Sequence, residues 1–219
     1  MKAVLFDLDF TLFNTDKYYL EAFLDISKYL ESKYGLASDK VCKTLVEMSS
    51  QRKDKYSHLF DDLISHYNLK DEKIEDMVKV FNRHKVDSSY LYPDALPTLA
   101  NLRSKKYKLA IITDGNLERQ THKIENLGLE KLVDTITYTQ NSEPKPSPAP
   151  FMVALKAIDV EPSSAICVGD NPMLDFAGPK KIGIKTVRIL RGRYTHIPHD
   201  DVDYTIENLD ELQDILAKI

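Results

Sequence analysis

Short apolar runs recur along the chain, and several of them end directly in polar residues. The first run, residues 3–6, leads into Asp7-Leu8-Asp9. Two later runs end in the same way, 107–112 in Thr113-Asp114-Gly115 and 165–168 in Gly169-Asp170-Asn171. Such runs are typical of strands buried in a parallel sheet, where ligands bind beyond the carboxyl ends of the strands. We therefore expect these polar residues to lie at one site.

A helical pattern separates the first run from the others. From Asp16 to about Asp87 apolar residues recur every three or four positions, and Gly35 is a candidate C-cap for the first series. The predicted helices cover residues 20–34, 41–48, 56–66 and 74–81. This segment is expected to form a helical bundle.

After Pro93 helical and strand patterns alternate. The expected helices are 96–104, 117–127, 148–158, one ending at Lys181, and 209–216; the expected strands are 109–112, 135–138, 165–168, 185–189 and 203–206. Together with the opening strand, this alternation predicts an α/β fold with a doubly wound parallel sheet.

Composition narrows the class of protein. The 219 residues can bury a substantial core, and the apolar runs are far shorter than the roughly 20 residues of a membrane-spanning helix. A formal net charge of −4 gives no basic footprint for nucleic acid. Of the two cysteines, Cys167 lies inside an apolar run, which favours buried thiols over a disulfide or metal site. We expect a cytoplasmic protein that binds neither nucleic acid nor membrane.

The opening acid pair requires a positive partner. Asp7 and Asp9 repel each other, and each raises the pKa of the other unless a cation or hydrogen bonds stabilise the charged forms. Lys145, within Glu143-Pro144-Lys145-Pro146-Ser147-Pro148, is a candidate partner. The alternatives are that the acids cap a turn and that the prolines form a linker. We favour a rigid loop, because Ser147 and Pro148 suit the start of a helix.

The residues occur in a characteristic order: an acid pair, a hydroxyl at Thr113, a lysine at 145, and a second acid pair, Asp170 and Asp175. This order resembles the haloacid dehalogenase superfamily of phosphotransferases, whose motifs are hhhDxDxT, a Thr or Ser after a second strand, a Lys, and GDxxxxD. The resemblance covers essentially the whole chain. It implies a Rossmann-like core at 1–14 and 92–219, a small helical cap at 15–91, and hinges near Asn14-Thr15 and Tyr90–Tyr92.

The resemblance also implies the catalytic roles. Asp7 is the nucleophile that forms an aspartyl phosphate, and Asp9 protonates the leaving oxygen and later accepts a proton from water. Mg²⁺ is expected to bind the carboxylates of Asp7 and Asp170 and the backbone carbonyl of Asp9, because this ion prefers oxygen ligands. Lys145 neutralises Asp7 and the transferring phosphoryl group.

Other residues are expected to support these groups. Thr113 and the backbone N–H groups of Asp114 and Gly115 would bind phosphate oxygens. Many relatives have Asn at the position of Asp114, so only its main chain is expected to contact phosphate. The remaining supporting residues are Asp175 and Asn171, which would orient Lys145 or a metal-bound water, and Thr11, which would hold the turn by hydrogen bonding. In the helical segment, Arg52 and Lys53 could reach an anionic substrate or could simply be solvated surface residues.

The resulting expectation is a Mg²⁺-dependent phosphatase, similar to phosphoglycolate phosphatases or nucleotidases, acting on a small phosphorylated metabolite as a monomer or homodimer. A 2-haloacid dehalogenase generally lacks the second acid, so Asp9 argues against that alternative. A phosphomutase would keep every catalytic residue and remains open. A receiver-like phospho-accepting module would have its phosphorylated Asp on a later strand and no helical insertion. A catalytically silent binding protein would not need all of these residues.

Overall fold

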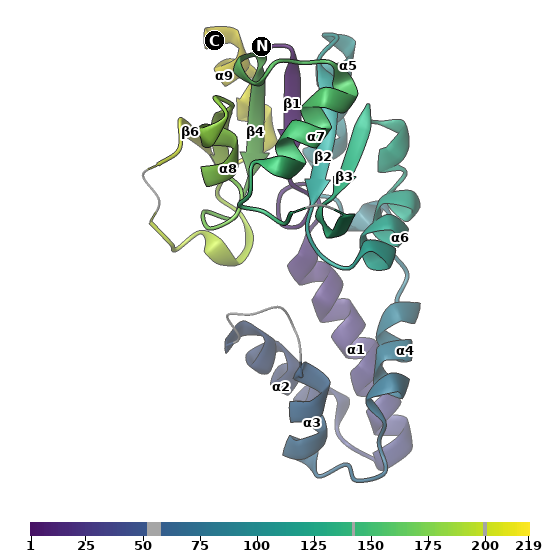
Figure 1. The fold of residues 1–219 in the computed structure, drawn as a ribbon. Coiled ribbons are helices and arrows are strands. Elements are labelled where there is room, and N and C mark those ends of the chain that lie inside the picture. The colour runs from purple at the N-terminus through teal and green to yellow at the C-terminus, as the bar shows by residue number, and fades with distance from the viewer. Residues whose placement is uncertain (52–57, 142, 199–200) are drawn as a thin grey trace. The chain divides into compact units, whose positions relative to one another are not determined.

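A six-stranded parallel sheet organises the larger part of the molecule (Figure 1). The computed structural model describes residues 1–51, 58–141, 143–198 and 201–219. Its strands are β1 (Ala3–Phe6), β2 (Lys108–Thr113), β3 (Thr135–Tyr138), β4 (Ala165–Gly169), β5 (Lys185–Ile189) and β6 (Tyr204–Ile206). Their order in the sheet is β3-β2-β1-β4-β5-β6, and every neighbouring pair is parallel. The strand order reverses at β1, so the carboxyl end of β1 lies between those of β2 and β4, where open α/β sheets bind ligands. The predicted fold class is confirmed.

The central strands are buried on both faces. Ala3 and Leu5 of β1 pack in one cluster with alternate residues of β2 and β4 and with apolar residues of α7 (Ala149–Ile158). Val4 and Phe6 alternate with them and are also fully buried. Because successive side chains of a strand point to opposite faces, the sheet must be covered on both sides. This double burial explains why the strands appear in the sequence as continuous apolar runs.

The helices of this part occur where the pattern predicts them, within a few residues. They are α5 (Ala95–Ser104), α6 (Leu117–Leu127), α7, α8 (Ala177–Lys181) and α9 (Leu212–Lys218), with short 3-10 turns at Ser88–Tyr90, Leu129–Lys131, Thr139–Asn141, Pro162–Ser164, Gly192–Tyr194 and Leu209–Glu211. The Asn116 side chain accepts a hydrogen bond from the backbone N–H of Arg119 and begins α6, while Gly128, with φ of 65°, ends it. These caps satisfy backbone groups that a helix end leaves without partners.

In the second unit, Asp16–Lys85, the described residues form four helices. They are α1 (Thr15–Tyr34), α2 (Ser38–Gln51), α3 (Leu59–Tyr67) and α4 (Ile74–Arg83). The ring of Tyr19 stacks on those of Phe23 and Phe81, with centroids 5.9 and 5.7 Å away. These aromatic residues therefore contribute to the packing within the unit. Arg52 and Lys53, which we considered for substrate binding, lie outside the described residues.

The boundary between the units differs from the one expected. The larger unit comprises Met1–Thr15 and Val86–Ile219, so residues 86–91 belong to it rather than to the helical segment. Backbone hydrogen bonds explain the assignment: Asn14 N–H donates to Tyr90 O at 2.7 Å, and Tyr92 N–H donates to Leu12 O at 2.9 Å. These contacts tie the returning chain to the turn after β1.

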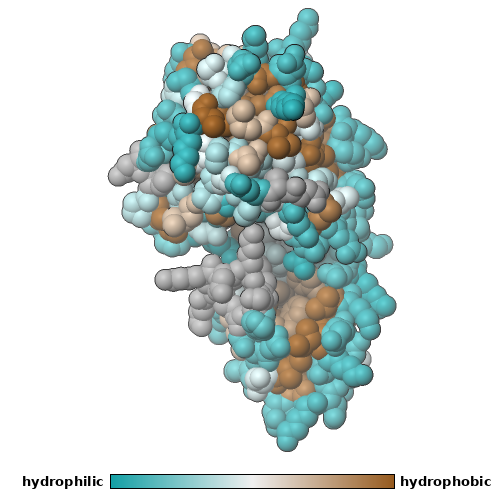
Figure 2. Space-filling view, viewed as in Figure 1, coloured by the Kyte–Doolittle hydropathy of each residue, from teal (hydrophilic) through white to brown (hydrophobic). Residues whose placement is uncertain are grey.

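The face seen in Figure 2 is mainly hydrophilic, with scattered hydrophobic residues on the larger unit and a band of them on the helical unit. Among the described residues of that unit, the large apolar side chains that are exposed are Leu20, Leu24, Val46 and Ile74. Within the part of the chain that the structure describes, no helix has the length and apolar character needed to cross a membrane. Cys42 and Cys167 are both buried free thiols.

Candidate active site

Three strands carry the candidate residues to one edge of the sheet. Asp7 directly follows β1, Thr113 is the last residue of β2, and Asp170 directly follows β4. The backbone N–H of Asp7 donates to the carbonyl of Val168 at 2.9 Å, which extends the pairing of β1 and β4 up to the acid. The parallel arrangement therefore brings together residues that lie more than 100 positions apart in the sequence.

Lys145 is buried among these acids. Its Nζ lies 2.6 Å from Asp7 Oδ1, 2.7 Å from Asp175 Oδ1 and 3.9 Å from Asp114 Oδ2, and the residue is only 5% exposed. Burial alone would lower the pKa of Lys145, but Asp175 and Asp7 raise it well above its usual value. Lys145 is therefore a fixed positive charge.

The loop that carries Lys145 leads directly into a helix. The hydroxyl of Ser147 accepts a hydrogen bond from the backbone N–H of Ala149, the first residue of α7, at 3.2 Å. The peptide bond between Lys145 and Pro146 is cis. This segment is a defined loop and not an extended proline linker.

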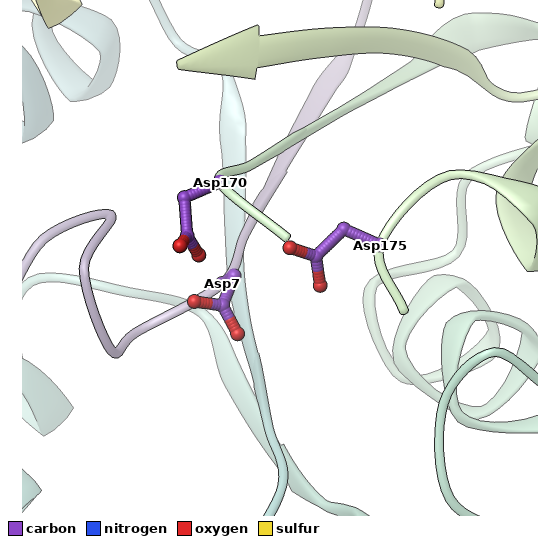
Figure 3. Close-up of side chains that lie close together, drawn as sticks. All are labelled: Asp7, Asp170 and Asp175. Atoms are coloured by element: carbon purple, nitrogen blue, oxygen red, sulfur yellow. The ribbon is translucent and has the colours of Figure 1, made fainter. Parts of the chain in front are cut away.

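The carboxylates of Asp7, Asp170 and Asp175 converge (Figure 3). Oxygens of Asp7, Asp170 and Asp175 all lie within 4.8 Å of one another. Asp175 is held by the backbone N–H of Asn171, which donates to its Oδ2 at 2.8 Å. A Cβ atom on Gly169 would lie 2.4 Å from the same oxygen, so the close approach of Asp175 requires glycine there.

The charges of this acid trio are not balanced. Burial, together with the nearby charges of Asp175 and Asp9, raises the pKa of Asp7 to about 7 against the opposing effect of Lys145. Burial and the charges of Asp175 and Asp7 likewise raise the pKa of Asp170 well above its usual value. In the described part of the chain, Lys145 contacts two of these three acids, Asp7 and Asp175, and ionising all three requires further positive charge.

The trio has the chemistry of a divalent-cation site. Asp170 Oδ2 is buried and has no hydrogen-bond partner among the described residues. A buried polar atom without a partner is costly, and a carboxylate oxygen is the ligand type that Mg²⁺ prefers. The residues present therefore fit such an ion, with Asp7 and Asp170 offering carboxylates. Asp175 is already engaged by Lys145 and by the Asn171 N–H group.

Asp9 has a different environment, with several donors for one carboxylate. Lys123 Nζ lies 2.6 Å from Asp9 Oδ1, and the Thr15 hydroxyl donates to the same oxygen at 2.8 Å. Gln120 Nε2 donates to Asp9 Oδ2 at 2.8 Å. Burial opposes ionisation, but Lys123 and these hydrogen bonds lower the pKa of Asp9 overall. Asp9 is therefore a stable carboxylate, and its side chain remains 31% exposed.

The residues after β2 are also linked to this network. Thr113 Oγ1 accepts a hydrogen bond from Gln120 Nε2 at 2.5 Å, and the Asp114 carbonyl accepts one from the same nitrogen at 3.0 Å. The Asp114 carboxylate accepts from the Thr139 hydroxyl and, at 3.4 Å, from the backbone N–H of Lys145. Gly115 follows with φ of 120°, a conformation that favours glycine.

Thr11 holds the turn through its main chain. Its backbone N–H donates to Leu8 O at 3.3 Å, and its carbonyl accepts from Arg191 Nη1 at 3.0 Å. The Thr11 hydroxyl is buried without a partner in the described part of the chain. Asn171, the other supporting residue, accepts a hydrogen bond from the backbone N–H of Met173 at 3.0 Å.

Sequence reasoning missed three residues that contact Asp9: Thr15, Gln120 and Lys123. Gln120 and Lys123 are 3% and 5% exposed although both are polar. A glutamine and a lysine three positions apart on the buried side of a predicted helix were a possible signal. Helical periodicity alone could not show which strand end they would face.

Comparisons with known proteins agree with this geometry. Residues 4–189 match the family model described as haloacid dehalogenase-like hydrolase. The chain is 30% identical to a glyceraldehyde 3-phosphate phosphatase of Methanocaldococcus jannaschii, covering 100% of this chain and 98% of that protein. It is also 30% identical to a phosphoglycolate phosphatase of Aquifex aeolicus, covering 97% and 95% of the two chains.

A solved structure gives the same result. The crystal structure of a phosphatase of this family from Thermococcus onnurineus is similar, with a TM-score of 0.68 and 29% identity over 99% of this chain and 98% of the other. The matches span nearly the full length of both chains, and they agree with the acids, the hydroxyl and the lysine found at one edge of the sheet. The chain therefore belongs to the haloacid dehalogenase-like hydrolases, as an enzyme of their phosphatase branch.

Proposed function

We propose that this enzyme is a Mg²⁺-dependent phosphatase that hydrolyses a small phosphomonoester by way of a phosphorylated Asp7. The observation that carries the proposal is the acid trio of Asp7, Asp170 and Asp175. Lys145 contacts Asp7 and Asp175, while Asp170 Oδ2 is buried without a partner among the described residues. The relatives are named for glyceraldehyde 3-phosphate and phosphoglycolate, which supports a small substrate.

The first half of the reaction uses Asp7 and Asp9. A carboxylate oxygen of Asp7 attacks phosphorus and the bond from phosphorus to the leaving oxygen breaks. Asp9 is a carboxylate in the free enzyme, so it takes up a proton when the negatively charged substrate binds beside it and gives that proton to the leaving oxygen. Lys145, 2.6 Å from Asp7 Oδ1, places positive charge where the phosphoryl group is transferred. Thr113 and the N–H groups of Asp114 and Gly115 would donate to the phosphoryl oxygens.

The second half restores the enzyme. Water attacks phosphorus, Asp9 accepts its proton, and the bond from Asp7 to phosphorus breaks to release phosphate. Mg²⁺ held by Asp7, Asp170 and the Asp9 carbonyl would supply positive charge to the phosphoryl oxygens. Asp175 keeps Lys145 in place through their 2.7 Å contact, and Asn171 in turn holds Asp175.

We assign substrate selection to the helical unit, as a cap. The unit is inserted between β1 and β2, immediately after the residues that carry Asp7 and Asp9. Binding energy from the part of a substrate that does not react can then be used at the reacting centre.

The test is phosphate release from a panel of phosphorylated metabolites and an aryl phosphate, with Mg²⁺ and after exhaustive EDTA treatment. The panel includes phosphoglycolate, glyceraldehyde 3-phosphate, nucleoside monophosphates, sugar phosphates and pyrophosphate. We expect turnover of at least one small monoester that EDTA abolishes and Mg²⁺ restores. Full activity after EDTA would contradict the proposal, chloride release from 2-chloropropionate would favour a dehalogenase, and isomerised sugar phosphate without phosphate release would favour a phosphomutase.

A further inference from the structure

Two buried polar residues of α6 face the Asp9 carboxylate. Lys123 and Gln120 are one helical turn apart, and both are almost completely buried. Burying an ammonium group and an amide is costly unless each has good partners. Their partners include Asp9, so the helix provides a preformed setting for this one carboxylate.

The contacts hold both oxygens of the carboxylate. Lys123 Nζ donates to Oδ1 and Gln120 Nε2 donates to Oδ2, at 2.6 and 2.8 Å. The ammonium group is itself confined, because Nζ lies 4.6 Å from the centre of the Phe13 ring. With each oxygen bound to a different side chain, the carboxylate cannot rotate about its Cβ–Cγ bond without losing a contact.

Gln120 also connects Asp9 to the phosphate-binding side of the site. The same Nε2 atom reaches Thr113 Oγ1 at 2.5 Å and the Asp114 carbonyl at 3.0 Å. The Gln120 amide thus sets the position of the Asp9 carboxylate relative to the Thr113 hydroxyl. In the described part of the chain, Gln120 is the residue whose hydrogen bonds reach Asp9, Thr113 and Asp114 together.

We propose that Lys123 and Gln120 are positioning residues that aim the Asp9 carboxyl group at the leaving oxygen. The inference rests on the proposed function, because it assigns the pair to the step in which the leaving group receives a proton. A misplaced acid would matter for an alkyl ester, whose leaving oxygen needs that proton. It would matter little for p-nitrophenyl phosphate, whose leaving group is stable as an anion.

The experiment compares kcat/KM for β-glycerophosphate and p-nitrophenyl phosphate in Lys123→Met and Gln120→Leu. This ratio reports the steps up to loss of the leaving group. We expect a loss of about 10- to 100-fold for the alkyl ester, since small misplacements can have effects of this size, and only a few-fold loss, at most about threefold, for the aryl ester. Lys123→Arg, which keeps a cationic donor, should recover most of the alkyl-ester activity.

Two controls separate positioning from folding. Lys156→Met, at an exposed lysine of α7, should leave both substrates unaffected. Thermal melts followed by circular dichroism identify any variant that is unfolded at the assay temperature, and Lys123→Arg then provides the comparison. Equal losses on both esters, or no loss on either, would overturn the inference while leaving the proposed function intact. A wild-type enzyme without Mg²⁺-dependent phosphatase activity would overturn both.

Discussion

The two sides of the site treat their carboxylates in opposite ways. In the acid trio, Lys145 contacts two of the three carboxylates, and the pKa of Asp7 is raised to about 7 mainly by burial. Around Asp9, which is partly buried, one carboxylate has three donor side chains, and its pKa is lowered although desolvation acts against ionisation there too. Because desolvation opposes ionisation in both places, the number of donors per acid decides whether the pKa is raised or lowered.

The acid trio needs a cation to balance its charge, whereas the charge of Asp9 is already balanced by a side chain of the protein. The trio lacks positive charge and contains the unpartnered Asp170 Oδ2. Asp9 has its charge balanced by Lys123 at 2.6 Å. Mg²⁺ should therefore affect the trio strongly and the Asp9 carboxylate weakly, although Asp7 and Asp9 belong to the same opening motif. The following variants test that difference.

The largest effect is expected from Asp7→Asn. An amide cannot act as the nucleophile, so turnover and phosphoenzyme formation should disappear together, with a loss in kcat of more than about 10⁴-fold. Steady-state assays and acid-quenched phosphoenzyme labelling measure the two quantities. Wild-type rates in this variant would show that the nucleophile lies elsewhere.

Asp9→Asn should have the next largest effect. General acid–base catalysis is typically worth about 10² to 10⁴ in rate, and that factor should be lost from kcat. Mg²⁺ affinity, measured by calorimetry, should change little because the proposed contact with the ion is the backbone carbonyl. Loss of Mg²⁺ binding in this variant would show that the Asp9 carboxylate itself contributes to the metal site.

Asp170→Asn should act through the ion. We expect the Mg²⁺ affinity to fall by at least about 10- to 100-fold, the scale seen when metal sites are disturbed. Without metal, the melting temperature should stay level or rise by about 2–4 °C, because a neutral amide removes repulsion within the trio. Asp214→Asn, at an exposed position of α9, is the matched control. A lower melting temperature in the metal-free Asp170→Asn variant, with unchanged Mg²⁺ affinity, would contradict the charge deficit.

The smallest effect on a minimal substrate is expected from removing the helical unit. Both sides of the site lie within Met1–Thr15 and Val86–Ile219, so replacing residues 16–85 with a Gly/Ser linker should keep both. kcat/KM for a small aryl phosphate should fall by less than about tenfold, while KM for the preferred metabolite rises steeply because the unit to which we assign substrate selection is lost. Undiminished selectivity in a folded variant would assign specificity to the loops of the larger unit.

The chain order of the acids, hydroxyl and lysine was readable from the sequence because parallel strands carry their ends to one edge of a sheet. The continuous apolar runs of β1, β2 and β4 showed that these strands are buried on both faces, and the residue after each run marked the edge. The helical segment could be predicted because its apolar residues recur every three or four positions. Its boundary at residue 85 was not, because the backbone pairing of Asn14 with Tyr90 depends on where the chain returns.

What only the tertiary structure decided is how each charge is matched. The sequence placed Asp7 and Asp9 together and predicted a positive partner, but the two acids have different lysines, at positions 145 and 123. Asp7 is instead grouped with Asp170 and Asp175, which the strand order brings alongside it. A sequence pattern records which residues follow a strand. The distances between side chains of different strands and helices, which set the electrostatic energy, exist only after the sheet has formed and the helices have packed against it.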